Sequence, residues 1–355
     1  MELTTLGLPA NDLIAARLDE ENGLIWGRVS VEQKERYTVE SESGTYLSEV
    51  TGNLRYSAES RADFPAVGDW VKLTVIDDQT AIIVQLIPRK NALERQSVKH
   101  YGSKQIIASN IDCALITVAV GQDLNINRIE RYMSICHTAS IEPIIVITKT
   151  DQILPNELED LLSTIEHRIV NVPIVMISNI DMSGFDQLRS IMKGGVTYCV
   201  LGSSGVGKST MINNLSEEKR MEVNSVSSST HKGRHTTTHR ELFVLPNASI
   251  IIDTPGMREL GVLEEEQGIR DTFVTIEELA PHCKFNDCQH QGEHGCAVSA
   301  AIEEGKLSEQ ELVNYHKLQR EQQRFNSEIH ERRSKDKKQG QLYKQIQQSK
   351  RSRNT

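Results

Sequence analysis

The sequence has few cysteines, no long apolar run and no excess of basic residues. Of its six cysteines, Cys113, Cys136 and Cys199 each stand alone in an apolar segment, and the others crowd together late in the chain. This usage excludes a disulfide framework and is typical of a reducing compartment. No run approaches the roughly 20 apolar residues of a membrane span, and the start, MELTTLGLPANDL, lacks the features of a secretory signal. We therefore expect a cytoplasmic protein with no membrane partner.

Acidic residues outnumber basic ones, 49 to 40, but the charge is unevenly spread. Residues 331–355 contain nine basic and two acidic residues, so the rest of the chain is strongly acidic. A basic tail on an acidic body indicates a polyanionic partner that meets one end of the molecule. The alternative is a solvated tail that binds nothing. Because Tyr343 is the only aromatic residue of the tail, we expect phosphate contacts rather than base stacking.

The pattern of apolar residues divides the chain of 355 residues into several domains. Five short strands within residues 24–88 predict a small closed barrel, with an OB-like fold favoured and an SH3-like barrel as the rival. From about residue 105, strands alternate with helices, which predicts a mostly parallel sheet covered on both faces. After residue 261 the strands stop and helical segments follow. We expect an extension (1–20), an OB-like β-barrel (21–98), an α/β domain (99–262) and a small α-helical domain with a basic tail (263–355).

The segment GSSGVGKS fits the phosphate-loop pattern G-x-x-x-x-G-K-[ST] and lies between an expected strand and an expected helix. Glycines let successive N–H groups face the phosphates, and the helix adds its positive N-terminal end. Lys208 is expected to reach the β- and γ-phosphates, and Ser209 to ligate Mg²⁺. The predicted phosphate-binding residues are Gly202, Ser203, Ser204, Gly205, Val206, Gly207, Lys208, Ser209 and Thr210. This motif alone does not choose between an ATPase, a kinase and a GTPase.

A second motif, TKTD, ends the expected strand before residue 148. Asp151 would accept two hydrogen bonds from guanine, and Lys149 would lay its alkyl stem over the base. The predicted base-contacting residues are Thr148, Lys149, Thr150 and Asp151. Thr148 stands where asparagine is usual, which puts a bridge to the phosphate loop in doubt, although a hydroxyl could serve. Ser178, at the next strand end, fits a second guanine-contacting loop, and a chance KTD at a strand end is the alternative.

A third motif, DTPG, follows the expected strand at Ile251. Asp253 would hold Mg²⁺, and the N–H of Gly256 would sense the γ-phosphate. Met257 follows, and its apolar side chain cannot orient the attacking water. The polar segment at residues 227–241 is typical of a switch loop, in which one threonine of 236–238, assigned as Thr237, would complete the Mg²⁺ shell.

Three histidines within this polar segment are spaced by four residues: His231, His235 and His239. Such spacing binds a metal only on a helix, and this Ser/Thr/Gly-rich stretch is a poor helix former. We favour a switch loop in which His235 orients water or stabilises charge.

A late cluster, Cys283-x4-Cys288-x-His290-x5-Cys296, places four metal-ligand side chains within fourteen residues. Three cysteines and one histidine form a tetrahedral structural zinc set. His294 is the alternative fourth ligand. We expect one structural zinc ion that braces the helical domain.

The nucleotide motifs run in an unusual order, with TKTD before GSSGVGKS and DTPG last. This is the small-GTPase set cut and rejoined, which a sheet tolerates when the old termini lie close together. The cut leads the segment after DTPG directly into the C-terminal domain. With FPAVGDWV, NRIERY, GRHTTT and the cysteine cluster, this order resembles the circularly permuted, ribosome-small-subunit-dependent GTPase A family (RsgA) over nearly the whole chain.

The resemblance implies an OB barrel, a circularly permuted GTPase domain and a zinc domain, with GTP/GDP, Mg²⁺ and Zn²⁺ as ligands. It also implies GTP hydrolysis stimulated by the small ribosomal subunit and its rRNA during late maturation, by a protein expected to be a monomer. His290 as the fourth zinc ligand follows the family's spacing, and an apolar residue at Met257 is itself a family feature. One alternative is a non-hydrolytic RNA-binding module with nucleotide as a structural ligand. Another is a P-loop ATPase or kinase, which Asp151 argues against.

Overall fold

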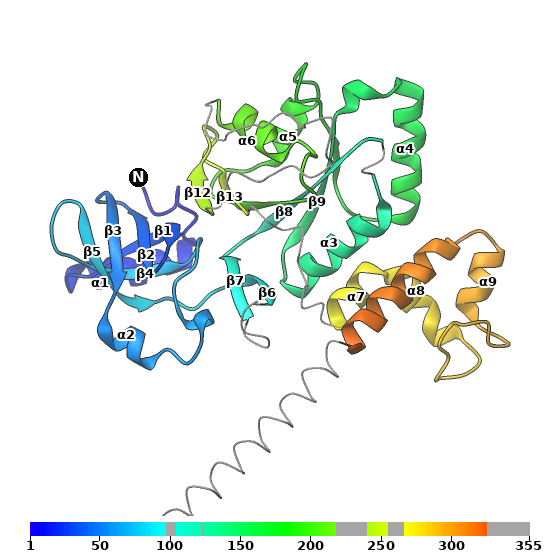
Figure 1. Ribbon diagram of the computed structural model, residues 1–355, viewed down its shortest axis with the longest axis horizontal. Coiled ribbons are helices and arrows are strands. Elements are labelled where there is room, and N and C mark those ends of the chain that lie inside the picture. Colours follow the sequence, from blue (N-terminus) through cyan, green and yellow to red (C-terminus); the bar gives the residue numbers. More distant parts are fainter. Residues whose placement is uncertain (97–103, 122–123, 218–239, 255–265, 325–355) are drawn as a thin grey trace, which may run out of the picture.

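The computed structural model describes residues 1–96, 104–121, 124–217, 240–254 and 266–324. Three units are visible in Figure 1: a barrel near the N-terminus, an α/β sheet and a group of helices near the C-terminus. The predicted fold class is therefore confirmed, and the pairing of the strands decides the type of barrel.

The barrel has five strands: β1 (Ile25–Gln33), β2 (Arg36–Ser41), β3 (Thr45–Val50), β4 (Trp70–Val75) and β5 (Thr80–Leu86). They pair in the order β1-β2-β3-β5-β4, and a pairing of β1 with β4 closes the barrel. Strands β3 and β5 run parallel, with helix α2 (Gly52–Ser57) in the crossover after β3. This five-stranded order is that of an OB-type barrel and resolves the choice that periodicity left open.

The N-terminal extension packs against the barrel. It contains the 3₁₀ helix η1 (Ala10–Asp12) and helix α1 (Leu13–Glu21). The side chains of Leu3, Leu6 and Leu8 are buried with Trp26 and Trp70 of the barrel. Burial of these leucines stabilises the barrel wall that faces the α/β sheet.

The α/β sheet has six strands: β8 (Cys113–Ala119), β9 (Glu142–Thr148), β10 (Ile174–Met176), β11 (Thr197–Leu201), β12 (Glu241–Val244) and β13 (Ile250–Asp253). They pair in the order β10-β9-β8-β11-β13-β12, and β12 alone is antiparallel to its partner β13. The parallel strands are rich in Val and Ile and buried on both faces, as helix-covered strands must be.

Helices cover both faces of this sheet (Figure 1). On one face lie α3 (Ile126–Thr138) and α4 (Pro155–Arg168), and on the other α5 (Phe185–Ile191) and α6 (Lys208–Ser216). The buried apolar side chains of α3 and α6 belong to two separate clusters, one on each face. Because the helices cover the two faces, the carboxyl ends of the parallel strands remain open, and ligands of such sheets bind there.

The barrel and the α/β sheet are joined edge to edge. Val31 of β1 pairs with Glu241 of β12, which makes one continuous sheet of eleven strands. Between the barrel and the α/β sheet, β6 (Ala92–Gln96) and β7 (Lys104–Ser109) pair as an antiparallel hairpin.

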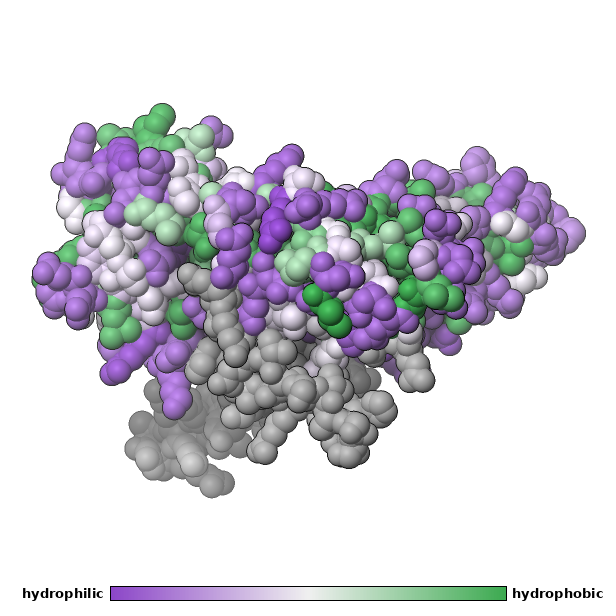
Figure 2. Space-filling view, turned by 90° about the horizontal axis from the view of Figure 1, so that it is seen from above, coloured by the Kyte–Doolittle hydropathy of each residue, from purple (hydrophilic) through white to green (hydrophobic). Residues whose placement is uncertain are grey.

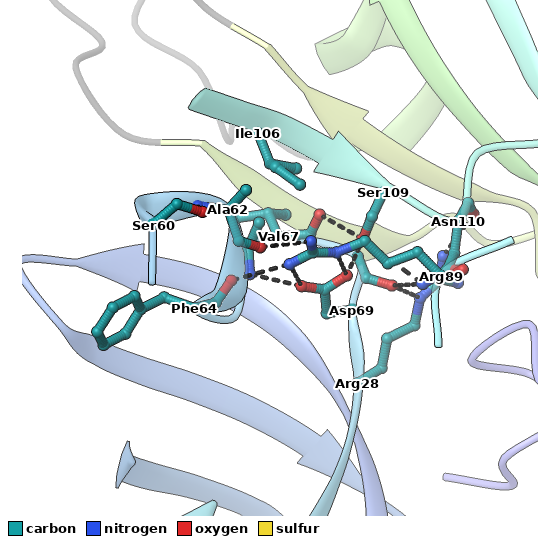
Figure 3. A network of polar contacts seen from close by, with 12 residues as sticks. Arg28, Ser60, Ala62, Phe64, Val67, Asp69, Arg89, Ile106, Ser109 and Asn110 are labelled. Atoms are coloured by element: carbon teal, nitrogen blue, oxygen red, sulfur yellow. Dashed lines mark hydrogen bonds and ion pairs between the residues drawn. The ribbon is translucent and has the colours of Figure 1, made fainter. Parts of the chain in front are cut away.

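A buried polar network fixes this joint (Figure 3). Asp69, fully buried, pairs with Arg89 at 2.7 Å and accepts a hydrogen bond from Ser109 Oγ at 2.5 Å. The guanidinium of Arg28, also buried, donates to the carbonyls of Leu6, Gly68 and Asn110. Burial lowers the pKa of Arg28 to about 10. Arg28 Nη1 also donates to Thr197 Oγ1 of β11 at 2.9 Å. Because the bonded groups come from the extension, the barrel and the α/β sheet, Arg28 holds all three together.

The C-terminal unit is helical, as expected: α7 (Glu266–Thr272), α8 (Val274–Leu279), the 3₁₀ helix η5 (Ala280–His282), α9 (Ala297–Glu303) and a helix at residues 309–324. Ser308 caps the last of these, because its Oγ accepts a hydrogen bond from the N–H of Gln310 at 3.2 Å. Within the described part of the chain, no helix combines the length and apolarity needed to cross a bilayer. The face in Figure 2 is largely hydrophilic, with apolar side chains in small separate patches.

The helix at residues 309–324 buries a carboxyl group against the α/β domain. Glu311 is 6% exposed, and burial, with the nearby charge of Glu130, raises its pKa to about 7. Because the folded pKa exceeds that of an ordinary glutamate, folding is favoured at low pH, and this contribution is lost as the pH rises toward 7. We predict that Glu311→Gln removes much of the stability loss between pH 5 and pH 8, roughly 1–3 kcal/mol.

Thermal unfolding at several pH values measures this effect. Glu309→Gln, on the exposed side of the same helix, is the matched control and should keep the wild-type pH dependence. Parallel stability curves for Glu311→Gln and wild type would show that Glu311 has no such role.

Candidate functional site

The phosphate-loop residues lie at the carboxyl end of β11 and lead into α6. Gly202, Gly205 and Gly207 have φ values of 144°, 81° and 95°, in the region that favours glycine. A Cβ on Gly202 would also lie 2.2 Å from the carbonyl oxygen of Thr117 on β8. The glycine pattern is therefore required by the curl of the loop and by its close packing on the neighbouring strand. Ser209 and Thr210 stand in the first turn of α6.

Two charged residues lie in the phosphate-binding part of the site: Lys208 follows β11, and Asp253 ends the neighbouring strand β13. The Nζ of Lys208 donates to the carbonyls of Gly202 and Ser203, at 2.8 and 2.5 Å. Asp253, at the end of β13, is 7% exposed. Burial raises the pKa of Asp253 to about 6, although the positive charge of Lys208 opposes this shift. A buried carboxyl group beside a phosphate-binding loop fits a bound divalent cation, which would favour its ionised form.

The base-contacting residues lie beside the phosphate loop. Thr148, fully buried at the end of β9, donates from Oγ1 to the carbonyl of Val206 at 2.6 Å. The hydroxyl thus makes the bridge that the missing asparagine had put in doubt. Lys149 follows in the left-handed region with φ 59°, and Thr150 and Asp151 form the turn after it. This turn directs Asp151 toward the next loop.

Ser178 holds the carboxylate of Asp151. Its Oγ donates to Asp151 Oδ1 at 2.8 Å, and it also accepts the N–H of Ile180 at 3.2 Å. A carboxylate fixed by one neighbour can present its other lone pairs to a base. The strand-end loops at residues 148–151 and 178 are therefore in contact.

Asn179, which the sequence analysis did not single out, bonds to two parts of the candidate site. Its Nδ2 donates to the carbonyl of Gly207 at 3.3 Å, and its carbonyl accepts from Asn214 Nδ2 at 3.2 Å. It therefore links the base end of the site to the phosphate loop and to α6. Its place directly after Ser178 in a strand-end loop was the available signal.

The structure thus brings Thr148, Asp151, Ser178 and the phosphate loop together at the carboxyl ends of the parallel strands. Asp253 ends β13, which is separated from β8 by β11 alone. Four residues assigned from the sequence lie outside the described residues: His235, Thr237, Gly256 and Met257. The histidines at 231 and 239 lie outside them as well.

The cysteine cluster forms a compact set of metal-ligand atoms. One ligand atom each from Cys283, Cys288, His290 and Cys296 lies within 4.8 Å of the others. Cys283 Sγ is 3.6 Å from His290 Nδ1 and 4.0 Å from Cys296 Sγ. Around a tetrahedral zinc ion, such ligand atoms are about 3.5–3.8 Å apart. The spacing fits a four-coordinate metal ion, and His294 is not part of the set.

Backbone N–H groups complete this cluster. The N–H of Ala297 donates to Cys283 Sγ at 3.3 Å, and that of Ser299 to Cys296 Sγ at 3.4 Å. Burial raises the pKa of Cys296, but hydrogen bonds from Ser299 and His290 outweigh it, so the pKa falls to about 6. Such bonds favour the thiolate form that binds metals.

A parallel sheet with this phosphate loop, a base-contacting loop and a buried Asp253 defines a P-loop nucleotide-binding protein of the GTPase class. Because β9 with its base motif precedes β11 and the phosphate loop along the chain, this GTPase domain is circularly permuted.

Comparison with known proteins agrees with this class. The model of the RsgA GTPase family matches residues 86–263. The small ribosomal subunit biogenesis GTPase RsgA 2 of Lactiplantibacillus plantarum is 42% identical over 308 residues, which are 87% of this chain and 86% of that protein. The chain belongs to the RsgA GTPase family.

Solved structures show the same fold. The crystal structure of YjeQ from Thermotoga maritima matches with a TM-score of 0.62 and 25% identity, over 84% of this chain and 98% of that one. The crystal structure of YloQ, described as a circularly permuted GTPase, matches with a TM-score of 0.60 and 24% identity, over 84% and 95%. The circularly permuted GTPase fold expected from the motif order is therefore confirmed.

Proposed function

We propose that this chain hydrolyses GTP to GDP and phosphate on the small ribosomal subunit during late maturation of that subunit. We call the loops at the carboxyl ends of the parallel strands the nucleotide edge. The observation that carries the proposal is that these loops are bonded to one another, because Thr148 bonds to the phosphate loop and Ser178 holds Asp151. The relative from Lactiplantibacillus plantarum is named for small-subunit biogenesis, and this supports the choice of partner.

Each residue of the nucleotide edge has its own proposed role. Asp151 would select guanine, and Lys149 would cover the base. Lys208 would exchange its two carbonyl partners for the β- and γ-phosphates, whose charge it matches. Ser209, Thr237 and Asp253 would hold Mg²⁺, which when bound neutralises charge on the phosphates. Gly256 would contact the γ-phosphate. His235 would orient the attacking water, which the apolar side chain of Met257 cannot do.

We assign the RNA contacts mainly to the basic tail, together with faces of the barrel and the metal-binding unit. On the barrel, Arg36, Arg55 and Arg61 each form an ion pair with a glutamate. These pairs leave the barrel a weaker attractor of phosphate than the tail, whose charge is nearly all of one sign. The metal at the Cys₃His cluster is proposed to be one structural zinc ion. The protein is proposed to be a cytoplasmic monomer, and its six cysteines form no disulfide bond.

The GTPase rate with and without purified small ribosomal subunits tests the proposal. We predict slow turnover alone and a rise of at least roughly tenfold with subunits, since the partner would position groups around the transferred phosphate. The stimulation should fall as salt increases, because phosphate contacts are screened. Large subunits at equal concentration are the control. Equal rates with and without small subunits would contradict the proposed function.

A further inference from the structure

Helix α3 lies between strands β8 and β9 of the α/β sheet and the C-terminal unit (Figure 1). It begins after its cap, Asn125, whose Oδ1 accepts the N–H of Arg128 at 3.3 Å. The helix follows β8, the strand beside β11 in the sheet. Its first turn is therefore at the edge where the phosphate loop begins.

One side of this first turn contacts the phosphate loop. Arg128 Nη1 donates to the Oγ of Ser203 at 2.9 Å. Ser203 is also the residue whose carbonyl accepts from Lys208 at 2.5 Å. Arg128 thus bonds to the same residue that holds the phosphate-binding lysine.

The opposite side of the same turn contacts the C-terminal unit. Glu130 is two residues after Arg128, about 200° around the helix. It is 2% exposed, pairs with Arg168 at 2.5 Å and accepts from Asn314 Nδ2 at 2.5 Å. Asn314, on the helix at residues 309–324, is also 2% exposed. A second ion pair joins Arg131 to Glu321 of that helix.

The packing of α7 leaves this arrangement little freedom. A Cβ on Gly268 would lie 2.0 Å from Thr138 Oγ1 and 2.5 Å from the carbonyl oxygen of Ser134. His137 Nδ1 and Thr272 Oγ1 are 3.1 Å apart. Since α3 contacts α7 and the last helix closely, a shift of the C-terminal unit must move α3 or break these contacts.

We propose that Arg128 is a positioning residue for the phosphate loop, and that the C-terminal helix sets its position through Asn314 and Glu130. The inference rests on the proposed function, because it requires a nucleotide at the phosphate loop. A partner that moves the C-terminal unit would change nucleotide affinity through α3, and nucleotide would change the affinity for that partner by the same factor.

A double-mutant cycle on GDP affinity tests the proposal in the full-length, metal-loaded chain without ribosomes. Arg128→Ala and Ser203→Ala should each weaken GDP binding about threefold or more, and the double variant no further. Asn314→Ala should weaken binding in the same range, although its side chain contacts α3 rather than the nucleotide edge. In the Arg128→Ala background, Asn314→Ala should have no further effect. Arg128→Lys should restore part of the affinity.

Tyr315→Phe is the matched control. It removes a partly buried hydrogen bond of the same helix, from Tyr315 Oη to Glu277 Oε1 at 2.8 Å, within the C-terminal unit. GDP affinity should then stay within about twofold of wild type, which separates coupling from a general loss of stability. If Asn314→Ala lowers the folded fraction, Glu321→Gln replaces it in the cycle, because Glu321 is only partly buried. Glu321→Gln should weaken GDP binding less than Asn314→Ala, and in the Arg128→Ala background it should not weaken it further.

The outcomes distinguish the two proposals. Independent, multiplying effects of Arg128→Ala and Asn314→Ala overturn the coupling, and so does unchanged GDP affinity in Asn314→Ala. A wild-type protein that binds no guanine nucleotide overturns the proposed function itself.

Discussion

Replacing Asp151 with asparagine is expected to weaken GTP binding by roughly a hundredfold, since two charge-assisted hydrogen bonds to guanine are lost. Ser178 fixes the carboxylate at 2.8 Å, so the side chain has little freedom to turn away. In the variant, an amide N–H₂ group faces the donors N1–H and N2–H₂ of guanine, which leaves at least one donor unpaired. Xanthine carries a carbonyl where guanine has its amino group, so the amide can donate to it. We therefore predict that the variant prefers XTP to GTP.

Competition of GTP, XTP and ATP for a bound fluorescent guanine nucleotide measures this change of preference. Asp160→Asn, an exposed acid on α4, removes the same charge away from the site and should leave the preference unchanged. An Asp151→Asn protein that still prefers GTP would show that another group reads the base. Equal binding of ATP and GTP by the wild type would favour the ATPase or kinase alternative.

Removal of the metal is expected to unfold the C-terminal unit and to leave the α/β domain folded. The thiols of Cys283 and Cys296 are themselves part of the small apolar core of this unit. A structural zinc ion contributes on the order of 10 kcal/mol to such a fold, far more than so small a core supplies. Without it, the three cysteines would repel one another as thiolates or require protonation. The helix at residues 309–324 would then lose its packing.

Metal content, far-UV circular dichroism and GDP titration before and after chelation measure this effect. We expect GDP binding to persist, weakened no more than by Asn314→Ala, because the nucleotide edge is built on the sheet. His290→Ala should lose the metal, whereas His294→Ala, outside the four-ligand set, should retain it. A protein that keeps its helical content and metal after His290→Ala would contradict the assignment.

Motifs made of contiguous residues could be predicted because their chemistry depends on local spacing. The glycines of the phosphate loop require positive φ at three nearby positions, and four metal ligands within fourteen residues can meet without help from distant segments. Strands β9, β11 and β13 were predicted because buried parallel strands are continuous apolar runs. The order of the motifs then fixed the permuted connection, since a parallel sheet brings its strand ends to one edge.

Long-range contacts could not be predicted, because a single sequence does not record which segments pair. An OB-like and an SH3-like barrel share the same alternation, and only the parallel pairing of β3 with β5 separates them. Leu6 and Arg28 meet across 22 positions, so no local pattern showed that the extension fastens the barrel to the sheet.

The sequence by itself determined the nucleotide class, the permuted order and the cysteine cluster, since each depends on residue type and short spacing, whereas the structure separates His290 from His294. Only the tertiary structure decided the barrel type, the roles of Thr148 and Asn179, and the place of α3 between the phosphate loop and Asn314. These depend on which surfaces meet, and side chains 184 positions apart, such as Glu130 and Asn314, come together only when the whole chain has packed.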